Sequence, residues 1–191
     1  MGATMRRLML FVCLALAMPP LSFAEPSERL MPLPKELQAG ELPWFAITAK
    51  DEGGKYSALN RDKLKEIAKQ NGSKRVVFAF FATWCIPCLK GLKLMGEKAN
   101  ELKEKGILIV LINVGEDDYD KVSKWTEQYA KNGWLLGFDK YANLPVKFGL
   151  SKQGENVPYP RVLILDSNLS PLTLLGQEGN DFPQILWSVY E

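Results

Sequence analysis

The stretch that decides the fold is residues 76–89, VVFAFFATWCIPCL. Its first six residues, 76–81, are continuously apolar and rich in β-branched and aromatic side chains, which is typical of a strand buried on both faces. Two cysteines follow, Cys85 and Cys88, with Ile86 and Pro87 between them. Proline is favoured in the first turn of a helix, so a helix is predicted to begin here. The cysteine pair therefore lies at the junction between a buried strand and a helix.

The sequence after the cysteines completes a strand–helix–strand unit. A single helix is expected over residues 87–105 and ends at Gly106. A second continuously apolar run follows at residues 107–112, ILIVLI. The apolar stripe of the helix consists of Leu89, Leu92, Met95, Ala99 and Leu102. Strand, helix and strand at this spacing predict a right-handed βαβ unit with two parallel strands.

The flanking segments predict the remaining sheet and helices. Residues 44–48 and 56–59 are expected to form a hairpin around Gly53-Gly54, because glycine supplies the positive φ of a tight turn. Residues 162–165 and 172–175 are expected to form a second, antiparallel hairpin. Further helices are expected over residues 60–70, from Asp117 or Asp118 to Asn132-Gly133, over residues 144–148 and over residues 181–190. The predicted class is α/β, a central mixed sheet flanked by helices with an N-terminal β-hairpin extension.

Residues 1–24 have the layout of a secretory signal peptide. Arg6 and Arg7 precede an apolar run over residues 8–18, and Ser-Phe-Ala before position 25 supplies the small residues of a cleavage site after Ala24. The run is shorter than the ~20 apolar residues that cross a bilayer. We therefore expect an exported, periplasmic or extracytoplasmic protein, with an N-terminal membrane anchor as the alternative. Residues 25–43 are expected to be an extended leader, and residues 44–191 a single domain.

Composition excludes several classes of site. The chain has 191 residues and no histidine, so it has no Ser-His or Cys-His catalytic pair and no His-ligated metal. Segment 1–24 holds two of the 24 basic residues and no acidic residue, which leaves 22 of each sign in the mature chain. A net charge of zero gives no reason to expect nucleic acid or an anionic membrane as a partner.

Cys13 leaves with segment 1–24, and the two remaining cysteines are too few for a Cys₄ zinc site. No metal and no cofactor are expected.

The position of the two cysteines predicts dithiol chemistry. Cys85 is expected at a helix N-terminus, where unpaired backbone N–H groups and the helix dipole favour an anion. The thiolate is the reacting form, so Cys85 is the expected attacking sulfur and Cys88, one turn on, resolves a mixed disulfide. A passive disulfide is one alternative, although so short a loop constrains the unfolded chain little. A zinc half-site shared between two chains is another, whereas Leu89 after Cys88 excludes a CxxCH haem-attachment site.

A second informative feature is Pro160, in the segment VPYPR (157–161) that leads into a predicted strand. With VVFAFFATWCIPCLK (76–90), ILIVLINVGED (107–117) and YPRVLILD (159–166), the sequence resembles the thioredoxin superfamily. The resemblance covers roughly residues 42–191. It is strongest to the exported TlpA/ResA-like thiol–disulfide oxidoreductases, which include partners of cytochrome c maturation, and the hairpin WFAIT…DEGGKYSAL is similar to that group's extension.

The resemblance implies a thioredoxin fold and roles for individual residues. It implies an exposed nucleophile at Cys85, a buried resolving sulfur at Cys88, and a cis peptide bond between Tyr159 and Pro160 that faces them. The residues implied to dock the substrate chain are Trp84, Ile86, Pro87, Tyr159 and Pro160. The implied partners are proteins with disulfides or dithiols and a membrane electron-transfer protein. The proteins of this group usually reduce disulfides, so reduction is the implied reaction. The alternatives are a disulfide oxidase or isomerase, or a non-catalytic binding or chaperone module.

Three positions depart from the pattern of the relatives. Thioredoxins carry a buried Asp six residues before the first cysteine, where this chain has Ala79, and ResA-like proteins carry a Glu three residues after the second, where this chain has Gly91. The proton acceptor for Cys88 is therefore not identified from the sequence; Glu97 and Glu116 are candidates, but each is expected to be a solvated surface charge. Tyr159 replaces the small Thr often found before the cis-proline.

Overall fold

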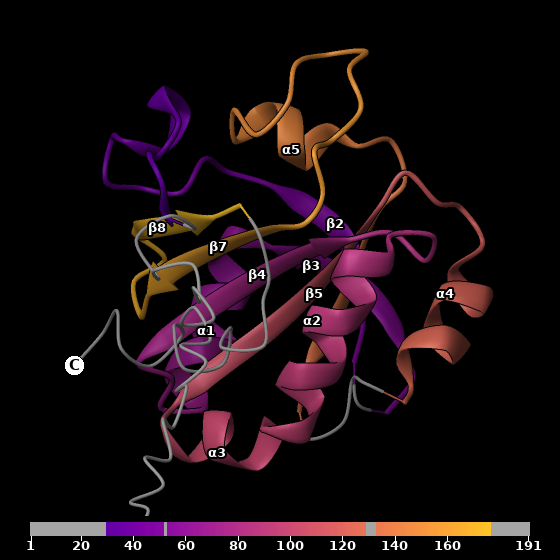
Figure 1. The fold of residues 1–191 in the computed structure, drawn as a ribbon. Coiled ribbons are helices and arrows are strands. Elements are labelled where there is room, and N and C mark those ends of the chain that lie inside the picture. Colours follow the sequence, from indigo (N-terminus) through magenta and orange to yellow (C-terminus); the bar gives the residue numbers. More distant parts are fainter. Residues whose placement is uncertain (1–29, 52, 129–132, 177–191) are drawn as a thin grey trace, which may run out of the picture.

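The computed structural model describes residues 30–51, 53–128 and 133–176. The predicted signal segment 1–24 and the predicted helix at 181–190 lie outside these residues. The described chain forms one eight-stranded sheet in the order β1-β8-β7-β4-β5-β6-β2-β3, with helices on both of its faces (Figure 1).

The two apolar runs form the centre of the sheet, as predicted. Strand β4 (Arg75–Phe81) pairs in parallel with β5 (Ile107–Val114) and antiparallel with β7 (Arg161–Asp166). Every residue of β5 is buried, because both faces of the central strands are covered. The parallel pairing places the C-terminal ends of β4 and β5 at the same edge of the sheet.

Side chains of β4 alternate between two cores, one on each face. Phe78 and Phe80 pack in the core that includes residues of α1 (Arg61–Gln70) and α5 (Asn143–Lys147). Ala79 and its odd-numbered neighbours pack in the opposite core. The helices of that second core are α2 (Ile86–Glu97), α3 (Ala99–Glu104) and α4 (Tyr119–Thr126). The cysteine-bearing helix therefore covers the face that Ala79 helps to line.

Both predicted hairpins are present. Strands β2 (Ala46–Lys50) and β3 (Tyr56–Asn60) pair antiparallel, as do β7 and β8 (Pro171–Leu175). The predicted leader differs from a free extended segment over the part that is described. Strand β1 (Leu30–Met31) pairs with β8 and a 3₁₀ turn covers Lys35–Leu37, while Leu37 and Leu42 are buried in the core.

The helix expected over residues 87–105 was wrongly predicted as continuous. Two helices, α2 and α3, meet at Lys98, whose φ of −107° and ψ of 13° leave the helical region. Its N–H donates to the Met95 carbonyl three residues back, at 3.1 Å, which closes α2 with a tight turn. Gly96 lies two residues before this break, and glycine costs a helix about 1 kcal/mol relative to alanine.

Strand β6 (Leu135–Asp139) was missed. It pairs in parallel with β5 and antiparallel with β2. Gly137 interrupts its apolar pattern, and the structure shows why a glycine is there: a Cβ at this position would lie 2.5 Å from Ile47 Cδ1. The side chain of the neighbouring strand thus fills the space that a β6 side chain would need.

The remaining helices agree with their predictions where they are described. Asn60 caps α1 by accepting from the Lys63 N–H at 2.8 Å, and α5 occupies the predicted short segment. Asp118, rather than Asp117, caps α4 by accepting from the Lys121 N–H at 2.9 Å. The predicted C-terminal part of that helix lies in residues 129–132, outside the described chain.

Candidate active site

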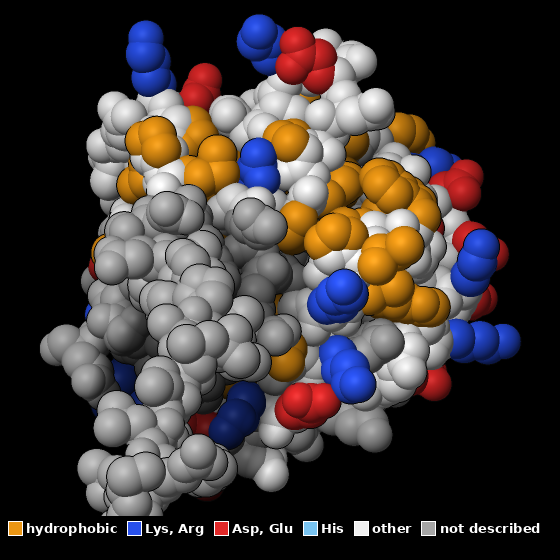
Figure 2. Space-filling model, viewed as in Figure 1, with side chains coloured by type: hydrophobic (Ala, Val, Ile, Leu, Met, Phe, Trp, Pro, Cys, Tyr) orange, Lys and Arg blue, Asp and Glu red, His pale blue; other side chains and the backbone are white. Residues whose placement is uncertain are grey.

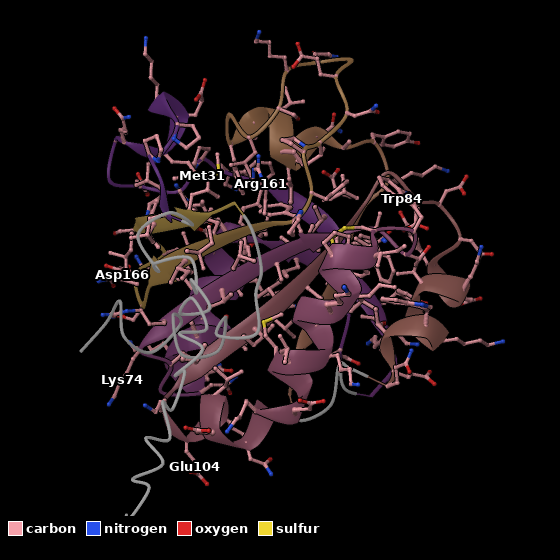
Figure 3. The ribbon with its side chains drawn as sticks, viewed as in Figure 1. Met31, Lys74, Trp84, Glu104, Arg161 and Asp166 are labelled. Atoms are coloured by element: carbon pink, nitrogen blue, oxygen red, sulfur yellow. A yellow bond between two sulfur atoms is a disulfide. The ribbon has the colours of Figure 1, made fainter. Side chains whose placement is uncertain are left out.

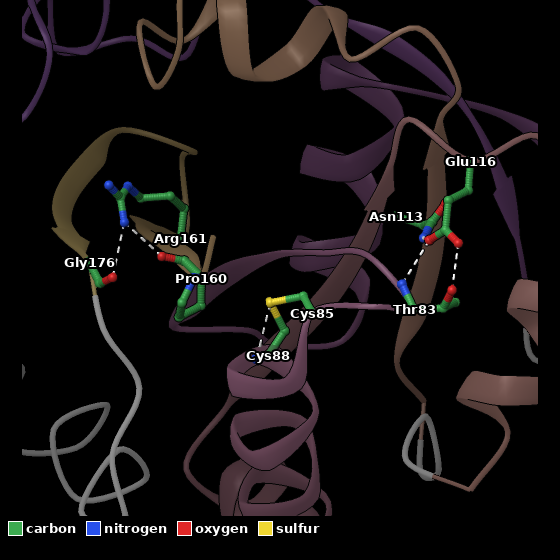
Figure 4. The surroundings of a disulfide bond; sticks show 8 residues. All are labelled: Thr83, Cys85, Cys88, Asn113, Glu116, Pro160, Arg161 and Gly176. Carbon is green, nitrogen blue, oxygen red and sulfur yellow. Dashed lines mark hydrogen bonds between the residues drawn. A yellow bond between two sulfur atoms is a disulfide. The ribbon is translucent and has the colours of Figure 1, made fainter. Parts of the chain in front are cut away.

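Cys85 and Cys88 are joined by a disulfide at the start of α2, with their Cα atoms 5.3 Å apart (Figure 4). Cys85 is the N-cap residue, and its Sγ accepts a hydrogen bond from the Cys88 N–H at 3.3 Å. Pro87 occupies the first helical turn, where its missing N–H leaves no bond unmade. The sulfur of Cys85 therefore lies where the helix dipole and the Cys88 N–H donor favour negative charge.

The two cysteines differ less in burial than the resemblance implies. Cys85 is 4% exposed and Cys88 is 1% exposed, so in the disulfide form neither is an exposed residue. The two cysteines differ in whether they line a surface hollow. Cys85 lines an open hollow of about 690 Å³, together with Trp84, Ile86, Pro87, Asn156, Val157 and Tyr159. Of the two cysteines, Cys85 is the one that lines this hollow.

The rim of this hollow is apolar and exposed. Trp84 is 67% exposed and Ile86 is 65% exposed, and the Trp84 ring meets the Tyr159 ring edge-on at 5.6 Å. Figure 2 shows hydrophobic side chains gathered over the N-terminal end of α2, with basic side chains over the helix below them. Exposed apolar patches of this kind are typical of interaction sites.

The segment that contains Pro160 lies on the other side of the disulfide. The Tyr159–Pro160 peptide bond is cis. Arg161 Nη1 donates to the Pro160 carbonyl at 2.8 Å and to the Gly176 carbonyl at 2.9 Å, which ties this segment to the chain directly after β8. Figure 3 shows Trp84 and Arg161 on opposite sides of the disulfide. The structure thus brings all seven predicted site residues to one end of the sheet.

Glu116 was wrongly expected to be a solvated surface charge. Its carboxylate accepts hydrogen bonds from the Thr83 N–H at 2.8 Å, the Thr83 hydroxyl at 2.5 Å and the Asn113 side-chain amide at 2.6 Å. Asn113 is paired with Phe81 across the parallel strands β4 and β5, so the residues that follow both strands meet at one edge. For Glu97 the expectation holds, because its side chain is 57% exposed and lies 4.0 Å from Lys93.

Two further ionisable groups lie at this edge of the sheet. Asp139 ends β6 and is buried, and it accepts the Asn143 and Leu144 N–H groups at 3.0 and 2.7 Å, which caps α5. Burial raises the pKa of Asp139 above its usual value, although those two bonds oppose the shift. Burial, followed by the negative charges of Asp139 and Glu116, raises the pKa of the Tyr159 hydroxyl well above its usual range. The carboxylates of Asp139 and Glu116 therefore lie at the C-terminal ends of β6 and β5.

The positions where relatives carry a carboxylate hold none in this chain. Ala79 and Gly91 are both buried on the disulfide face, so no side chain at either position can accept a proton from Cys88. Among the described residues, no group of three or more Cys, Asp or Glu side chains is arranged to hold a metal ion. The described helices also include none with the length and apolarity needed to span a membrane.

Comparison with known proteins agrees with this geometry. Residues 45–170 match the family model described as the AhpC/TSA family. The thiol-disulfide oxidoreductase ResA of Bacillus thuringiensis (strain Al Hakam) is 30% identical over 132 residues, which cover 64% of this chain and 69% of that protein.

Several solved structures have a similar fold. A putative thiol:disulfide interchange protein DsbE from Chlorobium tepidum aligns with a TM-score of 0.54 at 21% identity, covering 77% of this chain and 93% of that one. Enterococcus faecalis AhpC aligns with a TM-score of 0.60 at 17% identity, covering 78% of this chain and 87% of that one. At these identities the likeness establishes the fold, a mixed sheet flanked by helices as in thioredoxin.

Proposed function

Because this chain belongs to the AhpC/TSA family and is a thioredoxin-fold thiol–disulfide oxidoreductase, we propose that it reduces the disulfides of extracytoplasmic proteins. In this proposal Cys85 and Cys88 cycle between disulfide and dithiol. The observation that carries it is the Cys85–Cys88 disulfide at the N-terminus of α2, with Cys85 bordering an apolar, exposed hollow.

The cycle transfers two electrons in two exchange steps. The Cys85 thiolate attacks one sulfur of the substrate disulfide; a Cys85–substrate disulfide forms, and the second substrate sulfur leaves as a thiolate that takes up a proton. Cys88 then loses its proton and attacks Cys85 Sγ. The Cys85–Cys88 disulfide forms and the first substrate sulfur leaves as a thiolate. The substrate has gained two electrons, and a separate donor must return two to the cysteine pair before the next cycle.

The hollow around Cys85 is the proposed docking surface for the substrate chain. Trp84, Ile86 and Pro87 supply its α2 side, and Tyr159 lines it directly before the buried Pro160. The apolar side chains exclude water from the sulfur under attack. The backbone N–H and C=O groups of the bound partner then form hydrogen bonds with this protein instead of with water. Tyr159 is larger than the Thr of many relatives, so it narrows this surface and affects which partner chains fit.

Export and electron supply complete the proposal. Residues 1–24 direct the chain out of the cytoplasm, with cleavage near Ala24, or alternatively anchor it in the membrane. The donor is then a membrane electron-transfer protein, and the substrates include proteins that need free thiols, as in cytochrome c maturation. The intact mass of the exported protein distinguishes cleavage after Ala24 from a retained N-terminus.

A Cys88→Ser variant tests the proposed cycle. Without the resolving sulfur, the mixed disulfide formed by Cys85 cannot be released from within the chain, so an adduct with oxidised insulin is expected to accumulate and to dissolve in dithiothreitol. Non-reducing electrophoresis and intact mass measure it. A Cys85→Ser variant is the matched control and should form little adduct. An adduct that forms equally in both variants, or in neither, would contradict the assigned order of attack.

A further inference from the structure

We propose that Glu116 is a positioning residue that holds the loop before Cys85 and, through its negative charge, makes the Cys85–Cys88 dithiol a stronger reductant. This inference rests on the proposed function, since it concerns the electron affinity of the same cysteine pair. It assigns a role to a carboxylate in a chain whose Ala79 and Gly91 remove the carboxylates found in relatives.

The hydrogen bonds of Glu116 hold the loop between β4 and α2. Thr83 is bound through both its backbone N–H and its hydroxyl (Figure 4). The carboxylate is itself held by the Asn113 amide, and Asn113 is 0% exposed within the central strand β5. Two residues after Thr83, the Cys85 N–H closes a turn onto the Ala82 carbonyl at 3.0 Å. The contacts from Thr83 to Glu116 and from Glu116 to Asn113 thus connect the loop before Cys85 to the centre of the sheet.

The turn after β5 brings Glu116 back to the sheet edge. Gly115 adopts a φ of 79°, a conformation that glycine takes readily, and its N–H donates to the Asp139 carbonyl at 3.0 Å. Glu116 follows directly and reaches Thr83 on the neighbouring strand's loop. The half-buried Glu116 carboxylate thus accepts from three donors, whereas the side chain of Asp117, the next residue, is 74% exposed.

The charge of Glu116 acts on the region that holds the disulfide. Its carboxylate binds Thr83, two residues before Cys85. The pKa of the Tyr159 hydroxyl is raised by burial and then by the negative charges of Asp139 and Glu116, and the Tyr159 ring contacts that of Trp84, the residue before Cys85. Reduction converts a neutral disulfide into a dithiol whose Cys85 sulfur is stabilised as a thiolate by the α2 N-terminus. A nearby negative charge opposes this anion, so it shifts the equilibrium toward the disulfide. The reduced protein then gives up its electrons more readily.

The experiment compares the reduction potentials of the purified protein and its variants, each equilibrated with glutathione buffers. Glu116→Gln keeps the shape and removes the charge, and the equilibrium constant is expected to move toward the dithiol about tenfold, close to 30 mV upward. Asp117→Asn is the matched control: Asp117 is the next residue, its side chain is 74% exposed and it lies 3.6 Å from Lys140. It should change the constant less than about twofold, because an exposed charge is screened by water.

A Thr83→Val variant separates the effect of the Glu116 charge from the effect of its hydrogen bonds to the loop. It removes the hydroxyl bond to Glu116 and keeps the carboxylate, so the potential should stay near that of the wild type while the melting temperature falls. If Glu116→Gln lowers the melting temperature as Thr83→Val does and leaves the potential unchanged, Glu116 has only a structural role and the inference is overturned. Glu116→Ala gives the same comparison should the glutamine variant not fold.

The inference and the proposed function fail in different ways. A wild-type protein that reduces no protein disulfide would overturn the proposed function, whatever potential the variants have. A wild-type protein that reduces disulfides, with a Glu116→Gln variant at the same potential, would overturn the inference alone.

Discussion

A Cys85→Ser variant is expected to lose disulfide reduction entirely, to the rate of buffer without protein. A serine oxygen can neither ionise to a comparable nucleophile near neutral pH nor form the S–S bond on which the cycle depends. Cys88 remains, but it is 1% exposed and does not line the hollow. The reduction of insulin, followed by the turbidity of the released B chain with a dithiol as electron source, measures this loss.

The control for Cys85→Ser is a change on the same helix away from the hollow. Lys93 has a side chain that is 70% exposed, so Lys93→Gln should keep the wild-type rate. Circular dichroism should show that both variants are folded. A Cys85→Ser protein that still reduces insulin would refute the cycle. One that loses reduction but still assists a partner's assembly would favour a thioredoxin-fold binding module.

A Phe78→Ala variant is expected to lose about 3–5 kcal/mol of unfolding free energy, the usual cost of removing a fully buried phenylalanine. Phe78 is 0% exposed. Its ring meets Phe45 edge-on at 5.8 Å and stacks on Phe148 at 6.3 Å. The truncation therefore opens a cavity at the centre of one core and removes these ring contacts together with the edge-on contact to Phe80. Urea unfolding of the oxidised protein measures the change.

Two comparisons make the Phe78 result specific. Tyr141 is 76% exposed, so Tyr141→Ala should cost less than about 1 kcal/mol. Phe78 also packs on the face of the sheet opposite α2, so the folded variant should keep the reduction potential of the wild type. A loss below 1 kcal/mol in Phe78→Ala would contradict the packing described for this core.

The parts of the fold that could be predicted from sequence are those set by local pattern. Residues 76–81 and 107–112 are apolar without interruption because neighbours cover both faces of β4 and β5, so their sequences alone indicate buried strands. The two hairpins could be predicted for the same reason, because the residues that form each turn lie between the two strands in the sequence. Strand β6 carries no such signal, because Gly137 is selected by contact with Ile47, a residue 90 positions earlier.

The same distinction holds for the site. The spacing of Cys85 and Cys88, and Pro87 in the first turn, are local features that predict a cysteine pair at a helix N-terminus. Glu116 is 33 positions from Thr83, and their contact follows from the register in which β4 and β5 pair. In the sequence, Glu116 stands among acidic residues that are mostly exposed, and nothing local distinguishes it from them.

The most direct test of the central claim is the reduction potential of the Cys85–Cys88 pair in the wild-type protein, measured by equilibration in graded thiol buffers. A dithiol that reduces extracytoplasmic disulfides should have a potential near that of thioredoxin, ~−270 mV, or lower. Such a value would support the proposed reductant, and it agrees with the acidic Glu116 held against Thr83, two residues before Cys85. A value near ~−120 mV, like that of the oxidant DsbA, would contradict the reductase and indicate disulfide formation instead.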